Sequence, residues 1–395
     1  MNHWIERDKR YFMDTGHRRL GVTIVRGEGA RVWDEAGQEY LDLIAGWAAC
    51  SLGHCHPVVQ EALREQASRL ILASLDVYTI PQIELAELLT STCGLAKVFV
   101  CNSGAEANEG AVKLARKYGK LHLNGAYEVI STLKSFHGRT LAMVAATGKP
   151  EYQATFTPLP EGFINVPYND IPALRAAVRD RTCAILLEPI QGEGGVNIPS
   201  DHYLQEVRAL CDERGILLIL DEVQTGCGRT GMLWAHEHFG IRPDIMTVGK
   251  GLGGGVPIAA FLANERAACF GPGDHGSTYG GNPLCSAVAL EVLRFIMKED
   301  LVGNATRMGR YFQERLLGVQ ERRAIVKEVR GRGLLVAVEF TEPVAPAMAQ
   351  ACRERGLLIN PIPPRTIRFM PPLIITSQDI DRAVTILESA IEQIA

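Results

Sequence analysis

Short, strongly apolar runs recur through the middle of this 395-residue chain, each separated from the next by a stretch of helical character. The strands predicted by these runs end near Cys101, Leu133, Leu187, Leu220 and Val248. Helices are expected over 57–70, 104–118 and 201–214. Strands and helices that alternate at this spacing favour a mostly parallel sheet with helices on both faces, so we expect an α/β fold.

The two ends of the chain have different patterns. The first 50 residues begin as a polar helix and continue as three short segments separated by turn residues, which predicts a small antiparallel sheet. Helices are expected near the C-terminus over 286–298, 302–319, 344–355 and 377–394, with strands over 324–330, 334–340 and 366–369. The predicted domains are a large one over 51–285 and a small α+β one over 286–395, which the N-terminal segment 1–50 joins.

Composition excludes several classes of function. Acidic residues outnumber basic ones, 45 to 41, so no basic excess is available to bind nucleic acid. The apolar runs are far shorter than the roughly 20 residues of a membrane helix, and residues 1–10 lack the apolar core of a signal peptide. The ten cysteines are scattered and form no C-x-x-C pair. This pattern indicates reduced thiols in a cytoplasmic protein and predicts neither disulfides nor a metal site.

An acid and an amine end two of the predicted strands. Asp221 follows the apolar run 215–220, and Lys250 follows 244–249 with a glycine on either side. Both lie where parallel sheets bind ligands, beyond the carboxyl ends of the strands. A lysine that forms an imine and a carboxylate that keeps a ring nitrogen protonated are what a pyridine-aldehyde cofactor requires. The alternative partner for a buried Asp221 is an arginine or a helix N-terminus.

Other strand ends carry side chains that suit the same ligand. Ser103, Gly104 and Ala105 open a helix and form an anion cup of the kind that binds phosphate. Phe136 is placed to stack on a flat ring, and Arg139 to bind a carboxylate through its fork of donors. Each motif also has a simpler interpretation: an ordinary helix cap for the first, a core phenylalanine and a surface arginine for the second.

Two further segments complete this set. Three glycines in the segment 188–195 indicate a loop close to a ligand, or else a plain turn. Val223 is placed to cover the second face of the ring, and Gln224 to reach its hydroxyl, whereas His137 is interpreted as structural. The glycines near Lys250 follow the lysine, so the phosphate-loop order G-x-x-x-x-G-K-[ST] is absent and a nucleoside triphosphate is disfavoured.

Taken together, these motifs resemble those of the class III (ornithine-type) aminotransferases, which depend on pyridoxal phosphate, and most closely the acetylornithine branch of that family. The resemblance extends nearly from end to end and rests on the motifs LGHCHP, CNSGAEAN, SFHGRT, EPIQGEG, LDEVQTG, GKGLGGG and GSTYGGNP, which begin at residues 52, 101, 135, 188, 220, 249 and 276. It implies fold type I of the pyridoxal-phosphate-dependent transferases, with a mostly parallel seven-stranded sheet in the large domain. It also implies a homodimer with shared active sites.

The resemblance implies a role for each residue in these motifs. Lys250 and Asp221 are the catalytic pair, binding the cofactor aldehyde and the ring nitrogen. The other implied cofactor contacts are Ser103, Gly104, Ala105, Phe136, Glu222, Val223, Gln224 and, from the neighbouring subunit, Thr278. The implied substrate contacts are Arg139 for the donor carboxylate, Ser277, Arg368 for the second carboxylate of glutamate or 2-oxoglutarate, and Glu193, which pairs with that arginine when the second carboxylate is absent.

The implied reaction moves an amino group from an ω-amino donor, N-acetylornithine first, to 2-oxoglutarate with ping-pong kinetics, as in arginine biosynthesis. Ornithine, succinylornithine and a lysine-pathway amine are the alternative donors, and an aminomutase, racemase or decarboxylase is the alternative chemistry. A non-enzymatic relative is disfavoured because every cofactor residue is present. The chain departs from the branch's usual residues at Trp47, at Ala49-Cys50-Ser51 and over 360–366. We expect Trp47 to narrow or flatten the donor pocket.

Overall fold

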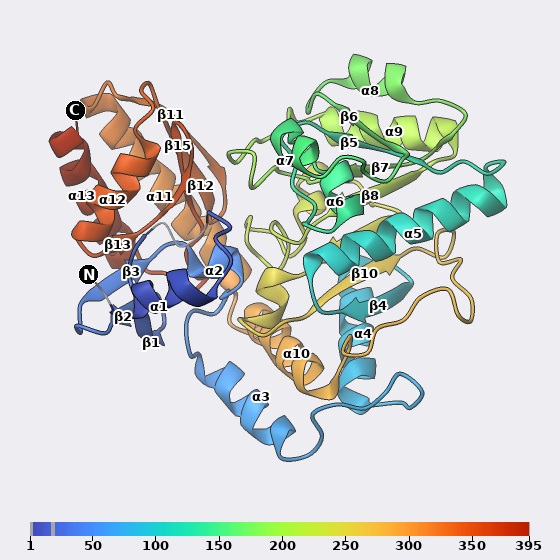
Figure 1. Ribbon diagram of the computed structural model, residues 1–395, viewed down its shortest axis with the longest axis horizontal. Coiled ribbons are helices and arrows are strands. Elements are labelled where there is room, and N and C mark those ends of the chain that lie inside the picture. The colour runs from blue at the N-terminus through green and yellow to red at the C-terminus, as the bar shows by residue number, and fades with distance from the viewer. Residues whose placement is uncertain (1–2, 17–19, 395) are drawn as a thin grey trace.

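The computed structural model describes residues 3–16 and 20–394, and its largest element is a seven-stranded sheet (Figure 1). The strands lie in the order β4-β10-β9-β8-β7-β5-β6. Their bounds are β4 Lys97–Cys101, β5 Glu128–Thr132, β6 Phe163–Val166, β7 Thr182–Leu187, β8 Leu217–Asp221, β9 Ile245–Val248 and β10 Ala259–Ala263. β10 is antiparallel to both of its neighbours, β4 and β9, and the other neighbouring pairs are parallel. The predicted mostly parallel sheet of seven strands is confirmed, although β6 and β10 lie outside the strands located from the sequence.

Both faces of this sheet are covered by helices, which explains why its strands are continuously apolar. On β8, Leu217 and Ile219 pack in the cluster that includes α5 Gly104–His122. Leu218 and Leu220 pack in the cluster that includes α9 Tyr203–Arg214. Because side chains alternate along a strand, a strand buried on both sides needs an apolar residue at every position. The same alternation directs Asp221, the last residue of β8, to the α5 side.

Further helices surround this sheet. The helices of this half are α3 Pro57–Ala67, α4 Ile80–Cys93, α6 Leu141–Ala146, α7 Pro150–Thr155, α8 Ile171–Ala177, η1 Ala235–Phe239, η2 Lys250–Gly253 and α10 Pro283–Lys298. The predicted helix at 57–70 ends earlier, at Ala67, and the one predicted over 104–118 continues to His122. Helix α10, which crosses the predicted domain boundary at 285/286, packs against α3 and α4. The boundaries themselves remain predictions.

Two four-stranded sheets form the other half of the molecule, with β1-β2-β3-β13 in one and β11-β12-β15-β14 in the other. Their strands are β1 Ile24–Glu28, β2 Arg31–Asp34, β3 Glu39–Asp42, β11 Val326–Arg332, β12 Leu335–Phe340, β13 Leu357–Leu358, β14 Asn360–Ile362 and β15 Thr366–Phe369. The helices are α1 His3–Tyr11, α2 Ala45–Ala48, α11 Leu301–Arg322, α12 Ala345–Glu354 and α13 Ser377–Ile394. The N-terminal sheet thus takes its fourth strand, β13, from the C-terminal part of the chain.

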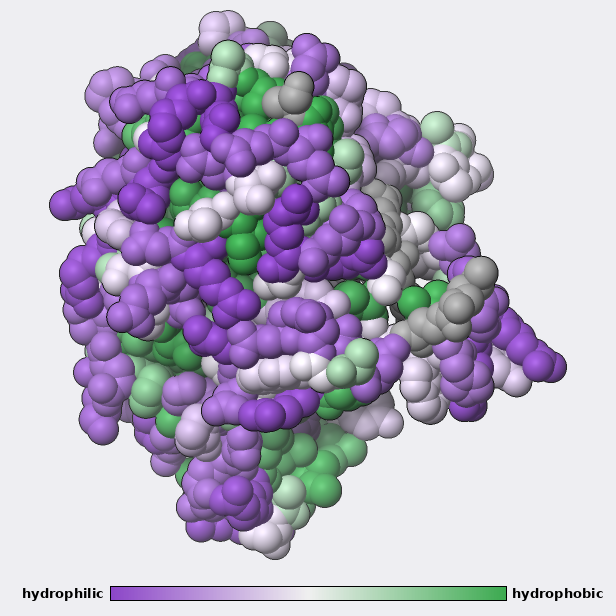
Figure 2. Space-filling model, turned by 90° about the vertical axis from the view of Figure 1, so that its left-hand side faces the viewer, coloured by the Kyte–Doolittle hydropathy of each residue, from purple (hydrophilic) through white to green (hydrophobic). Residues whose placement is uncertain are grey.

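The surface of this half is mainly hydrophilic on the side opposite the large sheet. Figure 2 shows that face, on which purple predominates and apolar residues emerge in smaller areas between polar ones. The apolar sides of α11, α12 and α13 are buried instead in the core that they share with β11, β12 and β15. In the described part of the chain, no helix combines the length and the apolar character needed to cross a membrane.

Candidate active site

Asp221 ends β8 inside the molecule, on the side that α5 covers. Its Oδ2 accepts a hydrogen bond from Asn108 Nδ2 at 2.7 Å and lies 2.8 Å from His137 Nδ1. Its Oδ1 accepts a hydrogen bond from the Val223 N–H at 3.0 Å. The carboxylate is almost fully buried, and within the described residues no arginine or lysine forms an ion pair with it. A buried charge held this way is available to neutralise a cation that enters the site.

Asn108 and His137 support Asp221, and the sequence analysis assigned this role to neither. Asn108 Nδ2 also donates to the His137 carbonyl at 2.8 Å, and its Oδ1 accepts from Thr247 Oγ1 at 2.8 Å. The His137 ring is buried, and its Nε2 has no hydrogen-bond partner among the described atoms. One signal was present in the sequence: Asn108 is four residues after Gly104, which places both on one side of the helix.

The residues of the predicted anion cup lie at the start of α5. Ser103 caps the helix, and its Oγ accepts the Glu106 N–H at 3.3 Å. The N–H groups of Gly104 and Ala105 donate no hydrogen bond to any described residue, as is usual for the first turn of a helix. A Cβ at Gly104 would lie 2.7 Å from Cγ1 of Val223, so glycine is required for this close approach. Two N–H donors therefore point to the place where an anion would bind.

Lys250 follows β9 in a strained conformation, with a φ of 44° in the left-handed region. For a residue other than glycine this costs about 1 kcal/mol or more, and such strain collects at functional sites. Burial lowers the pKa of its amine, and the charge of Glu193 opposes that effect. The charge of Arg368 lowers the same pKa further, whereas the charge of Asp221 raises it. The net lowering favours the neutral amine, the form that attacks carbonyl groups and accepts protons.

Arg368 lies on β15, so the sheet β11-β12-β15-β14 contributes a side chain to the site. This side chain is completely buried. Its Nη1 donates to Gln224 Oε1 at 2.9 Å, and its Nη2 to Glu193 Oε1 at 2.7 Å. Asn360 Oδ1 accepts from Nε and Nη2 of the same guanidinium at 3.1 and 2.8 Å. Burial alone raises the pKa of Glu193, but the charges of Arg368 and Lys250 outweigh it and lower that pKa to about 2. Glu193 therefore neutralises Arg368 in this structure.

Glu188 connects two predicted parts of the site, although the sequence analysis gave it no separate role. Its Oε1 accepts the Phe136 N–H and its Oε2 the Gly192 N–H, each at 2.9 Å. It thereby ties the predicted stacking ring to the loop that carries Glu193. The carboxyl is buried, and burial raises its pKa to about 7 against the lowering effect of His137.

This raised pKa predicts a dependence of stability on pH. Between pH 4.5 and 7 the unfolded chain releases the Glu188 proton while the folded chain retains it, so stability falls as pH rises. The free energy of unfolding of the wild type, relative to Glu188→Gln, is expected to decrease by about 2–3 kcal/mol between pH 4 and pH 8. Urea unfolding of both proteins at the two values and at one protein concentration measures it. A difference that is constant with pH would contradict the prediction.

Phe136 and Arg139 lie together on the loop after β5. The guanidinium carbon of Arg139 is 5.3 Å from the centre of the Phe136 ring. Phe136 is partly buried, whereas Arg139 is exposed. This arrangement leaves the arginine accessible to a substrate carboxylate while its position is maintained by the ring.

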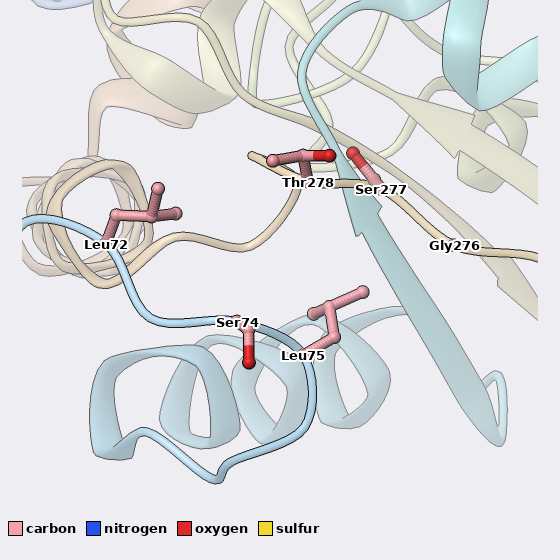
Figure 3. A pocket seen from close by; sticks show the side chains of 6 residues that line it. All are labelled: Leu72, Ser74, Leu75, Gly276, Ser277 and Thr278. Atoms are coloured by element: carbon pink, nitrogen blue, oxygen red, sulfur yellow. The ribbon is translucent and has the colours of Figure 1, made fainter.

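Ser277 and Thr278 line an open cavity of about 520 Å³ (Figure 3). Leu72, Ser74 and Leu75 form its opposite side, and Lys250 does not line it. Ser277 Oγ accepts hydrogen bonds from Asn102 Nδ2 at 3.3 Å and from the Gly280 N–H at 2.9 Å. Since Asn102 directly precedes the anion cup, the cavity and the cup are adjacent.

Glu222 is turned away from this group of residues. Its Oε2 accepts the Ala235 N–H at 2.6 Å, and its Oε1 accepts the His236 N–H at 2.8 Å and lies 2.8 Å from His236 Nδ1. Both oxygens thus cap the start of η1. The predicted cofactor contact of Glu222 is therefore not through its carboxylate, whose physical role is to hold η1 against the turn after β8.

Trp47 lies on an unusual turn beside the lysine loop. Residues 45–48 all have positive φ, so they form one turn of left-handed helix, and the Trp47 side chain is 47% exposed. Ser51 Oγ donates to the Gly251 carbonyl at 2.7 Å, which fixes this segment against the residue after Lys250. The position is compatible with the predicted influence on the donor, which remains a prediction.

Comparison with known proteins places this geometry in a family. A family model described as aminotransferase class-III matches residues 12–391. The acetylornithine aminotransferase of Caldanaerobacter subterraneus subsp. tengcongensis is 49% identical over 388 residues, 98% of either chain. That of Gloeobacter violaceus is 52% identical over 375 residues, 94% of either chain.

A solved structure agrees with this assignment. The ornithine aminotransferase of Toxoplasma gondii, crystallised with oxidised glutathione and with partial occupancy of pyridoxal phosphate at its active site, superposes with a TM-score of 0.93 at 38% identity. The match covers 98% of this chain and 93% of that one. The similarity extends over nearly the whole chain and is not confined to one motif. This chain therefore belongs to the class III aminotransferase family.

Proposed function

We propose that this protein is a transaminase that moves the amino group of N-acetylornithine to 2-oxoglutarate with pyridoxal phosphate as cofactor, a step of arginine biosynthesis. The observation that carries the proposal is the convergence of Asp221, Glu193 and Arg368 on Lys250, since the charges of these three residues all act on its buried amine. The two relatives named above are both acetylornithine aminotransferases, which supports the choice of donor.

The residues present fit pyridoxal phosphate. The buried Asp221 carboxylate has no arginine or lysine partner in the described residues and suits a protonated ring nitrogen. The N–H groups of Gly104 and Ala105 suit the phosphate, together with the Ser103 hydroxyl and, from a second subunit, Thr278. We assign the two faces of the ring to Phe136 and Val223. Gln224 uses its amide oxygen on Arg368, so its amide N–H remains for the ring hydroxyl.

The chemistry divides between cofactor and chain. When bound, pyridoxal phosphate supplies an aldehyde that takes up the amino group and a cationic ring that stabilises negative charge on the substrate carbon. The amine of Lys250, whose pKa is lowered by burial, removes the proton from that carbon and returns it one position away. Asp221 holds the positive charge at the ring nitrogen. Because donor and acceptor use the same residues in turn, ping-pong kinetics follow.

Arg368 and Glu193 explain how one site accepts both substrates. N-acetylornithine has one carboxylate, which we assign to Arg139, with Ser277 close to the donor. With this substrate Glu193 stays on Arg368 and no positive charge is left buried and unpaired. With 2-oxoglutarate, the second carboxylate replaces Glu193 on the guanidinium. Such a pair suits transamination, in which one site takes substrates with one and with two carboxylates in turn, whereas a racemase or a decarboxylase acts on a single substrate and does not need it.

A panel of amino donors tests the assignment. Purified enzyme with pyridoxal phosphate and 2-oxoglutarate is assayed for glutamate with N-acetylornithine, ornithine, N-succinylornithine, lysine and the α-amines alanine and aspartate. We expect the largest kcat/KM with N-acetylornithine, by about tenfold or more over ornithine, whose second amine would bring an unmatched charge into the site. A higher kcat/KM for ornithine would reassign the donor, and glutamate from α-amines alone would reject the ω-amine assignment.

We also infer a homodimer. Large apolar side chains are exposed along one segment of the described chain, namely Leu70, Ile71, Leu72, Leu75, Val77, Tyr78, Ile80 and Ile83. An apolar area of this kind marks an interface, and it adjoins the cavity that holds Thr278 (Figure 3). A second copy that covers it would bring its Thr278 to the first copy's anion cup. Sedimentation equilibrium checks this inference, and a single species of monomer mass at micromolar concentration would contradict it.

A further inference from the structure

Two cations share one pair of aromatic rings beside the site. The guanidinium carbon of Arg139 lies 5.3 Å from the ring centre of Phe136 and 4.2 Å from that of Tyr152. Lys149 Nζ lies 5.8 and 5.2 Å from the same two centres. Within the described residues, neither cation forms an ion pair with a carboxylate. Arg139 has a proposed substrate, but nothing so far explains Lys149.

The position of Lys149 is fixed by the backbone around it. The preceding residue, Gly148, accepts the Lys134 N–H at 2.7 Å and donates to Ser135 Oγ at 3.1 Å, and Lys149 then caps α7. A Cβ at Gly148 would lie 2.0 Å from the Thr132 carbonyl oxygen, so no other residue permits this approach. Lys149 is therefore attached to the segment that carries Phe136, and its side chain is only partly exposed.

Lys149 also acts on the interior of the site. Its charge is among those that lower the pKa of Glu193, the partner of Arg368. Two like charges held on one aromatic platform repel each other, and the ring faces compensate only about 1 kcal/mol for each. A carboxylate bound between the two cations would offset this repulsion and would be attracted by both charges. Two carboxylates of the site have other partners, since Glu193 binds Arg368 and Glu188 binds two backbone N–H groups.

We propose that Lys149 is a second cationic contact, beside Arg139, for the carboxylate of the amino donor, and that Tyr152 positions both cations. Lys149 then determines specificity: it favours donors that carry a carboxylate over the corresponding simple amines. The inference rests on the proposed function and adds a residue to the same site. Arg139 supplies a planar fork, and Lys149 a flexible point charge that follows carboxylates at slightly different depths.

The experiment compares two donors that differ only in the carboxylate. N-acetylputrescine is N-acetylornithine without its α-carboxylate. Lys149→Gln is expected to raise KM for N-acetylornithine about fivefold, the size of one partly exposed ion pair, with kcat within twofold of the wild type. The kcat/KM for N-acetylputrescine should stay unchanged. Lys149→Arg, which keeps the charge, should recover most of the affinity for N-acetylornithine.

Binding without turnover gives a second readout. Glutarate carries two carboxylates and no amine. Its dissociation constant, measured by calorimetry on both holoenzymes, should be larger for Lys149→Gln than for the wild type, by a factor similar to the rise in KM. The control for net charge is Lys298→Gln, since Lys298 is exposed at the end of α10, and it should change neither constant.

Three outcomes would overturn the proposal: equal losses with both donors, an unchanged KM together with an unchanged glutarate affinity, or the same loss in Lys298→Gln. Failure of the proposed function is distinguishable from these. If the wild type did not use N-acetylornithine, the donor would be wrong, whereas glutarate binding would still show whether Lys149 holds a carboxylate.

Discussion

Lys250→Ala is expected to reduce kcat by at least about 10⁴-fold. This change removes both the amine that binds the cofactor aldehyde and the base that moves the proton, and general acid–base catalysis alone contributes about 10²–10⁴-fold. The visible absorbance of the holoenzyme and the covalent link that borohydride makes permanent should be lost as well. Single-turnover kinetics with N-acetylornithine, a spectrum, and the mass of the borohydride-treated chain measure these effects.

Lys134→Ala is the matched control for this variant. Lys134 is also a lysine with positive φ, 64°, at the end of a strand of the same sheet, but it is exposed. Both substitutions place alanine at a position with positive φ, so their effects on the backbone should be similar. Only Lys250→Ala should lower turnover. Turnover by Lys250→Ala within tenfold of the wild type would remove the lysine from the mechanism.

Asp221→Asn is expected to lower kcat by about 10²–10³-fold, the usual cost of removing one preorganised charge from a buried site. The amide has nearly the same shape, but it brings no negative charge to the ring nitrogen. It also places an N–H₂ group among hydrogen-bond donors, because Asn108 and Val223 both donate to this carboxylate. Cofactor affinity should weaken for the same reason. Steady-state rates and the cofactor retained after gel filtration measure the two effects.

Asp244→Asn separates charge at the site from the general cost of altering a buried acid. Asp244 is also buried, where it pairs with Arg208 and accepts the Leu218 N–H at 2.8 Å. Its replacement is expected to lower thermal stability and to leave kcat within about twofold, because it touches no group of the site. If Asp221→Asn lost no more activity than Asp244→Asn, the assigned role of Asp221 would be refuted.

The strand ends were predictable because their physical signal is local. An apolar run followed by a polar or glycine residue appears in the sequence itself, and β4, β5, β7, β8 and β9 all end within one residue of the predicted positions. The strands β6 and β10 were missed for a reason. β6 is short and only partly buried, and only the short 3-10 helix η2 lies between β9 and the run that forms β10. A connection this short suits an antiparallel neighbour, because a parallel one needs a longer crossover.

Contacts between residues that are distant in the chain were harder to predict from the sequence. His137 was interpreted as structural because a single histidine carries little information, yet its ring lies 2.8 Å from a carboxylate 84 positions away. Alternation along a strand predicts that Asp221 and Glu222 point to opposite sides, but the sequence does not show that α5 lies on one side and η1 on the other. The pairing of Lys149 with Arg139 likewise depends on where α7 places Tyr152.

The amino-acid order alone established which residue types stand at the ends of which strands, hence the α/β class, the seven-motif family likeness and the cofactor chemistry. The fold class follows from local hydrophobicity and spacing, whereas the family and its cofactor follow from the resemblance of the seven motifs. Each of these signals lies within a short stretch of the chain. Only the folded molecule decided which charges face one another: that Glu193 occupies Arg368, that Glu222 caps η1, and that Asn108 and His137 hold Asp221. The physical reason is that hydrogen bonds and charge pairs act over a few ångströms in space, whatever the separation along the chain.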